Sequence, residues 1–221
     1  MEPPNRARID QVIRRVARYV ARCAEPYVTE ESRTRRDPFR VLISCMLSLR
    51  TKDETTAAAS KRLFARADAP EAMLGLSEKE IAGAIFPVGF YNTKARNIRA
   101  VCRRLLGEHD GRVPDDMDKL LALPGVGRKT ANLVLTMGYG KPGICVDTHV
   151  HRISNRWGWV RTKTPEQTEA ALRALLPRRY WIEFNNQLVT FGQNCCTPLS
   201  PHCSECPVAS DCPKIGVTRR R

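Results

Sequence analysis

The chain has 221 residues, enough for one large domain or two small ones, and its 42% hydrophobic and 27% charged residues are typical of a globular protein. Lysine and arginine number 37 against 23 aspartate and glutamate residues, so the net charge is +14. This excess favours a polyanionic partner, most commonly nucleic acid, although membrane-surface proteins can be equally basic.

The apolar runs of the sequence are too short to span a membrane. The longest apolar run, residues 41–49, is interrupted by Ser44 and Ser48 and is much shorter than the roughly 20 residues that cross a bilayer. The charged N-terminus lacks the apolar centre of a secretory signal. We therefore expect a cytoplasmic protein without a membrane partner.

The first part of the chain predicts helices. Apolar residues at helical spacing over residues 9–20 predict a helix that we expect to end at Pro26. Asp37, followed by a proline at the first helical position, predicts the capped start of a buried helix that reaches Leu49.

Helical signals continue to the C-terminal part. Ser77 with Glu80, and Thr164 with Gln167, have the spacing of capping boxes. Two more apolar faces are Ala95, Ile98, Cys102 and Leu105, and Trp181, Phe184, Leu188 and Phe191. With about ten helices and no convincing strand alternation, the sequence predicts an all-α fold.

Five of the nine cysteines lie in a short, proline-containing segment after Asn194. Those spaced Cys-x6-Cys-x2-Cys-x5-Cys are Cys196, Cys203, Cys206 and Cys212. Four thiolates so close repel each other unless a cation or cluster lies between them. Zinc usually takes two tight pairs, and only Cys203 and Cys206 form one, so the spacing favours iron–sulfur and leaves zinc open. Cys195 could compete with Cys196 for the first ligand position.

The segment LPGVGRKTAN, residues 123–132, joins two apolar helices. Gly125 and Gly127 permit positive φ and let backbone N–H groups converge where the second helix begins, near Arg128. This pattern indicates a helix-hairpin-helix that binds a DNA phosphate without reading sequence, with these three residues as expected DNA contacts.

Lys129 follows the hairpin glycines, and its simplest role is a phosphate contact. A nucleophilic lysine needs a lowered pKa or a nearby base, since a free lysine with a pKa of about 10.4 is protonated at neutral pH. Asp147, in VDTH, follows a helix and a glycine-containing loop that could return it to the same cleft. There it would stabilise positive charge on a sugar as a base departs. It could equally be a helix N-cap.

Together, LPGVGRKTAN, VDTH and the cysteine spacing resemble endonuclease III, a DNA glycosylase with AP lyase activity in the helix-hairpin-helix superfamily. The resemblance extends to LSLRTKDETT and GFYNTKARNI. It implies two helical lobes with DNA between them. The implied lobes are a helical barrel, residues 29–140, that contains the hairpin, and a second lobe, residues 1–28 and 141–221, that carries the iron–sulfur loop at residues 196–212.

The resemblance also implies a site and a reaction. Lys129 is implied as the Schiff-base nucleophile, Asp147 as the essential carboxylate, and a 4Fe-4S cluster as the group that the four cysteines hold. The implied activity removes oxidised pyrimidines from duplex DNA and cleaves 3′ to the abasic site by β-elimination, after the damaged nucleotide is flipped out. The expected partner is double-stranded DNA with a damaged pyrimidine or an abasic site, bound by a monomer that is associated with the nucleoid.

Two residues depart from the family pattern. Arg50 stands where the family often has glutamine, in a loop that fills the gap left by the flipped base, and it can still stack and donate hydrogen bonds. Phe90 stands where a leucine wedge is usual, and its ring can intercalate. His149 matches a DNA-contacting position.

Two alternative functions remain. A monofunctional mismatch glycosylase would share the hairpin, the aspartate and the cluster, but it lacks lysine at the position of Lys129. A non-catalytic DNA-binding module would combine the hairpin with a zinc site and use that lysine as a phosphate contact.

Overall fold

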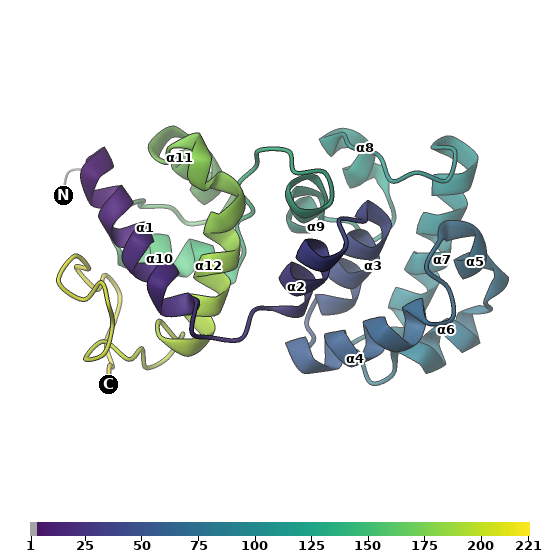
Figure 1. The fold of residues 1–221 in the computed structure, drawn as a ribbon, viewed down its shortest axis with the longest axis horizontal. Coiled ribbons are helices and arrows are strands. Elements are labelled where there is room, and N and C mark those ends of the chain that lie inside the picture. The colour runs from purple at the N-terminus through teal and green to yellow at the C-terminus, as the bar shows by residue number, and fades with distance from the viewer. Residues whose placement is uncertain (1–3) are drawn as a thin grey trace. The chain divides into compact units, whose positions relative to one another are not determined.

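The computed structural model describes residues 4–221, and within them the chain forms twelve α-helices, one π-helical turn and one 3₁₀ turn, without a strand (Figure 1). The expected all-α fold is confirmed, with somewhat more helices than the apolar stripes indicated. None of the described helices is long and apolar enough to span a membrane.

Two compact units make up the described chain. One is Tyr27–Lys141, and the other, here named the terminal unit, joins the described residues before Tyr27 to Pro142–Arg221. The helices of the first unit are α2 (Tyr27–Thr34), α3 (Pro38–Ser48), α4 (Asp53–Phe64), α5 (Pro70–Gly75), α6 (Glu78–Ile85), α7 (Tyr91–Glu108), α8 (Met117–Ala122) and α9 (Arg128–Leu133), followed by the π turn Val134–Gly138. Those of the terminal unit are α1 (Arg6–Val20), α10 (Thr148–Arg156), α11 (Pro165–Leu175), the 3₁₀ turn Arg178–Tyr180 and α12 (Trp181–Asn194).

Helix α3 forms the centre of the Tyr27–Lys141 unit. Its residues from Val41 to Leu47 are buried on every side, and it contacts α2, α4, α7, α9 and the π turn. Asp37 caps it as expected, because its Oδ1 accepts hydrogen bonds from the backbone N–H groups of Phe39, at 2.9 Å, and Arg40, at 3.2 Å.

The long helix α7 packs beside α5 and α6 along the face that its apolar spacing predicted. The four residues expected on that face, Ala95, Ile98, Cys102 and Leu105, are all buried.

The core of the terminal unit lies between α1, α10 and α12, and Figure 1 shows α1 beside α12. Phe184, Leu188 and Phe191 are buried as the spacing of α12 predicted, while Trp181 is partly buried. The prediction that Pro26 ends the first helix is wrong. The helix ends at Val20, because the N–H groups of Arg22 and Cys23 donate to carbonyl oxygens three residues earlier and so tighten the last turn.

One of the two expected capping boxes is complete. Ser77 and Glu80 exchange both hydrogen bonds at the start of α6. Thr164 accepts from the N–H of Gln167, but the Gln167 side chain accepts from Lys163 N, at 2.9 Å, instead of from Thr164. The second box is therefore half formed, since the glutamine reaches one residue too far back.

The cap of α3 can be tested by removing its acceptor. We expect Asp37→Ala to lower the free energy of unfolding by about 1 kcal/mol, because two N–H groups at a helix start lose their partner. Urea denaturation should show a lower midpoint at an unchanged slope. Asp37→Asn is the matched control, since asparagine keeps the acceptor, and an equal loss in both variants would contradict the capping role.

Candidate active site and cysteine centre

The hairpin between α8 and α9 is a tight turn closed by a hydrogen bond from Val126 N to Leu123 O, at 3.1 Å. Gly125 has a φ of +74°, and a Cβ atom there would lie 2.6 Å from Asn97 Nδ2, so this position requires glycine. Gly127 is different, because its φ of −98° is open to any residue, so only Gly125 uses the positive φ that both glycines permit. Apart from its neighbours along the chain, no atom of the described residues lies within 4 Å of a Cβ placed on Gly127, which leaves room for a ligand to approach the backbone.

Lys129 lies in the first turn of α9 and is half-buried, whereas Arg128 before it is exposed. Helix α9 packs against α3, and the Lys129 amine is close enough to Cys45 of α3 to influence it. Burial raises the pKa of the Cys45 thiol to about 12, and the Lys129 ammonium opposes that shift. The hairpin lysine is therefore partly withdrawn from water, on a helix that packs against α3.

Two loops of the same unit bring Arg50 and Phe90 together. Arg50 follows α3 with a φ of 53°, and Phe90 precedes α7 with a φ of 58°, both in the left-handed region that side chains other than glycine rarely adopt. The Phe90 ring is 63% exposed, and the guanidinium carbon of Arg50 lies 5.7 Å from its centroid. The two residues that depart from the family pattern are thus neighbours on one surface.

Asp147 lies in the terminal unit and is the N-cap of α10. Its Oδ1 accepts hydrogen bonds from the N–H groups of His149 and Val150, each at 2.9 Å, and the side chain is 8% exposed. The capping role that the spacing left open is therefore present. It holds the carboxylate in one orientation at a helix N-terminus, where the helix dipole favours negative charge.

Helix α10 also reaches the cysteine segment through two arginines that the sequence did not single out. Arg152 donates to the carbonyl oxygen of Cys196 at 2.8 Å and contacts Nδ1 of His149 at 3.2 Å. Arg156 is buried and donates to Cys196 Sγ at 3.4 Å and to the carbonyl oxygen of Thr197 at 2.7 Å. Their spacing of four residues on one helix was the only sequence signal for a shared role.

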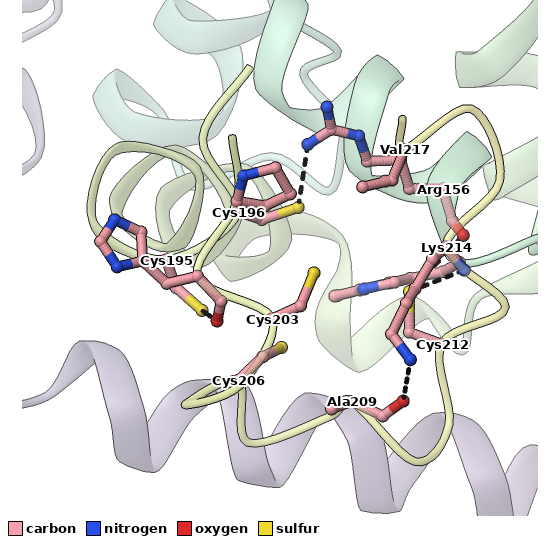
Figure 2. Close-up of a pocket in the computed structure, with 12 residues that line it drawn as sticks. Arg156, Cys195, Cys196, Cys203, Cys206, Ala209, Cys212, Lys214 and Val217 are labelled. Carbon is pink, nitrogen blue, oxygen red and sulfur yellow. Dashed lines mark hydrogen bonds between the residues drawn. The ribbon is translucent and has the colours of Figure 1, made fainter. Parts of the chain in front are cut away.

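The cysteine segment surrounds a cavity, and Figure 2 shows the sulfur atoms of Cys196, Cys203 and Cys206 directed toward one space. Cys212 lines the same cavity, where its thiol donates to Arg156 O at 3.6 Å. Burial raises the pKa of Cys212 to about 11.

The sulfur of Cys195 has a different environment. It points to the carbonyl oxygen of His202, at 3.8 Å (Figure 2). A hydrogen bond with Cys206 raises the pKa of the Cys195 thiol and lowers that of Cys206 to about 7. Cys195 lines the same cavity as the other four cysteines, but its sulfur is directed at a backbone oxygen.

The donors around this cavity fit an iron–sulfur cluster. Among its lining residues are all four cysteines of the Cys-x6-Cys-x2-Cys-x5-Cys spacing. Four cysteine thiolates are the ligand set of a four-iron cluster. Zinc also binds four cysteines, so the donor set alone leaves the choice between them open.

The predicted site residues therefore form two sets, one in each unit. The Tyr27–Lys141 unit contains Arg50, Phe90, Gly125, Gly127, Arg128 and Lys129. The terminal unit contains Asp147, His149, Cys196, Cys203, Cys206 and Cys212.

Two family models match the chain. Residues 43–178 match the HhH-GPD superfamily of base excision DNA repair proteins, and residues 196–212 match the iron–sulfur binding domain of endonuclease III. The second match covers the cysteine spacing from its first to its last cysteine. It decides the open choice between iron–sulfur and zinc, and the expected 4Fe-4S cofactor is confirmed.

Known proteins agree with this assignment. Endonuclease III of Thermotoga maritima is 50% identical over 176 residues, which cover 80% of this chain and 83% of that protein. The chloroplastic endonuclease III homolog 2 of Arabidopsis thaliana is 47% identical over 184 residues, so the chain spans 79% of its own length but only 48% of the plant protein.

A solved structure gives the same fold. The trapped covalent intermediate of an endonuclease III with DNA, an estranged-adenine complex, matches 96% of this chain and 97% of that one, with a TM-score of 0.84 and 33% identity. Sequence, cysteine centre and fold agree, and the chain belongs to the endonuclease III family of base excision DNA repair enzymes.

Proposed function

We propose that this chain is a bifunctional DNA glycosylase and AP lyase that removes oxidised pyrimidines from duplex DNA and cleaves the strand 3′ to the resulting abasic site. The observation that carries the proposal is the position of Lys129, an amine in the first turn of α9, which directly follows the glycine hairpin and packs against the buried helix α3. The related structure is of a covalent protein–DNA intermediate, and such an intermediate needs a nucleophile of this kind.

The amine performs both bond-breaking steps. Its nitrogen, in the neutral form, forms a bond to C1′ of the sugar as the bond from C1′ to the damaged base breaks. The base leaves with the electron pair and takes up the proton that the nitrogen loses. Opening of the sugar ring gives a Schiff base, which acidifies the C2′ proton. Loss of that proton expels the 3′ phosphate by β-elimination, and water then releases Lys129.

The carboxylate acts through charge. As the base departs, positive charge develops on the sugar, and Asp147 would stabilise it if the two units close on the same nucleotide. Capping through Oδ1 suits this role, because a carboxylate already oriented by α10 needs no reorganisation during the reaction.

Binding of the duplex is assigned to surfaces of both units. Gly125, Gly127 and Arg128 would hold a backbone phosphate, while Phe90 enters the stack and Arg50 fills the place of the flipped nucleotide. His149, at the start of α10, would add a contact from the terminal unit. We propose that the protein acts as a monomer in the cytoplasm and associates with the nucleoid through its DNA.

The cluster would be held by Cys196, Cys203, Cys206 and Cys212, with Cys195 retained as a thiol. When bound, the cluster supplies a cross-link to a segment with little apolar surface of its own. Asp211, next to the last cysteine, adds a 2.9 Å ion pair to Arg15 of α1.

The lyase assignment is tested by borohydride trapping on a duplex with one abasic site. Wild type should give a covalent adduct, and Lys129→Ala should give none while keeping its DNA affinity within a few fold, because the amine is the attacking group. Lys163→Ala, an exposed lysine before α11, is the control for loss of one charge. An adduct with Lys129→Ala would overturn the assignment, and loss of binding equal to loss of trapping would make Lys129 a phosphate contact.

The substitution Asp147→Asn tests the proposed catalytic charge of Asp147 separately from its role as the N-cap of α10. Asparagine caps helices as well as aspartate does, so the thermal midpoint should stay near that of wild type. Base excision should fall on the order of 10²-fold or more, because the transition state loses a stabilising charge. Single-turnover kinetics would measure this, with Asp37→Asn as the matched capping control. A wild-type rate would reduce Asp147 to a structural cap.

The cysteine assignment predicts opposite results for two neighbours in the cavity. Cys206→Ser should lower the bound iron and the visible absorbance of the purified protein and weaken DNA binding, because the segment loses its cross-link. Cys195→Ser should keep both iron and colour, since this thiol only donates a hydrogen bond. Loss of iron in Cys195→Ser, with iron retained in Cys206→Ser, would reverse the two roles.

A further inference from the structure

Lys94 is a buried lysine in the first turns of α7. Its side chain is 7% exposed, and its ammonium nitrogen donates to the carbonyl oxygens of Leu47 at 2.7 Å and Leu49 at 2.6 Å. A third bond goes to Oγ1 of Thr51 at 3.2 Å. A cation so far removed from water needs all of these acceptors, and burial lowers the pKa of Lys94 to about 8.

The acceptors lie at the C-terminal end of α3. The last carbonyl groups of a helix have no partner inside the helix, and the helix dipole makes this end negative. The ammonium of Lys94, which belongs to α7, therefore provides a hydrogen-bond donor for carbonyl groups at the C-terminal end of α3. Lys94 binds Leu49 and Thr51, the residues immediately before and after Arg50. The lysine therefore holds the loop on both sides of the arginine.

The same network reaches the loop before α7. Oγ1 of Thr51 accepts from the N–H of Gly89 at 3.2 Å, and a Cβ atom on Gly89 would lie 2.7 Å from the carbonyl oxygen of Arg50. The two loops are thus in direct backbone contact. Lys94 also donates its own N–H to the carbonyl oxygen of Phe90, at 3.0 Å. One residue is bonded to both loops.

These bonds explain how two strained residues persist. Arg50 and Phe90 both have positive φ, and non-glycine residues keep such a conformation only where the surrounding structure holds them. Their side chains lie together as a guanidinium–ring pair on the surface. Without the ammonium of Lys94, each of the three acceptors at the base of this pair loses one hydrogen bond.

We propose that Lys94 is a positioning residue for base extrusion, which fixes the Arg50 loop against the Phe90 loop so that the two side chains enter the duplex as one rigid unit. This role rests on the proposed function. Extruding a paired, stacked nucleotide costs free energy that the inserted pair must offset, while a site that has already lost its base costs less to extrude. Lys94 therefore contributes more to base excision than to cleavage at a preformed abasic site.

The test compares Lys94→Met, which keeps an apolar stem of similar length, with Lys61→Met, an exposed lysine on α4. Single-turnover rates are measured for excision of an oxidised pyrimidine from a matched duplex and for β-elimination at a preformed abasic site. We expect Lys94→Met to slow excision on the order of 10²-fold, as misplaced groups do, and to slow elimination by only about threefold. Lys61→Met should match wild type in both.

A spectroscopic measurement follows the extrusion step directly. A 2-aminopurine placed beside the lesion brightens when its stacking is lost, and Lys94→Met should give a smaller rise than wild type at saturating protein. Thr51→Val serves if Lys94→Met fails to fold. It breaks the link to Gly89, leaves both carbonyl contacts of Lys94, and should shift the two rates in the same unequal way.

Equal loss of both rates, or no loss of either in a folded variant, would overturn the positioning role. The wild-type enzyme separates this from failure of the proposed function. If wild type neither excises a base nor forms a covalent adduct, the proposed function is wrong. If wild type does both and Lys94→Met behaves as wild type, only the role of Lys94 is wrong.

Discussion

The burial of α3 is the constraint on which the Tyr27–Lys141 unit depends. Its residues from Val41 to Leu47 have no face toward water, so both ends of the helix must satisfy their polar groups through neighbouring segments. Asp37 does this at the N-terminus and Lys94 at the C-terminus. Lys129 lies on α9, which packs against its side. The hairpin lysine and the Arg50 loop are therefore both supported by one buried helix.

Helix α10 has the corresponding place in the terminal unit. Its first turn orients the Asp147 carboxylate, and its later turns carry Arg152 and Arg156, which hold the beginning of the cysteine segment. The cysteine segment has little apolar surface to bury, so it takes its position from these arginines, from the ion pair with α1 and from its cofactor. A carboxylate and a metal centre are thus attached to opposite ends of a nine-residue helix.

Local signals in the sequence predicted the helices well and the contacts between them poorly. Asp37, Ser77 and the stripe on α7 depend on residues within one or two turns, and the structure contains each of them. The error in the end of the first helix also has a local cause, because α1 ends before Pro26 where its last turn tightens. Lys94 was missed, since nothing in its neighbourhood along the chain indicates that residues 43 to 47 positions earlier accept its bonds.

Two buried cations, Lys94 and Arg156, and the partly buried Arg152 share one feature that relates stability to binding. Lys94, Arg152 and Arg156 all donate to backbone carbonyl oxygens at helix ends or in the cysteine segment, where those oxygens lack helical partners. A carboxylate in place of each carbonyl oxygen would also accept hydrogen bonds from the cation, but its negative charge would cancel the positive charge of the cation. Carbonyl oxygens satisfy the donors and leave the net charge of +14 intact. In a protein that must attract a polyanion, bonding buried cations to the backbone therefore stabilises loops without reducing the long-range attraction to phosphate.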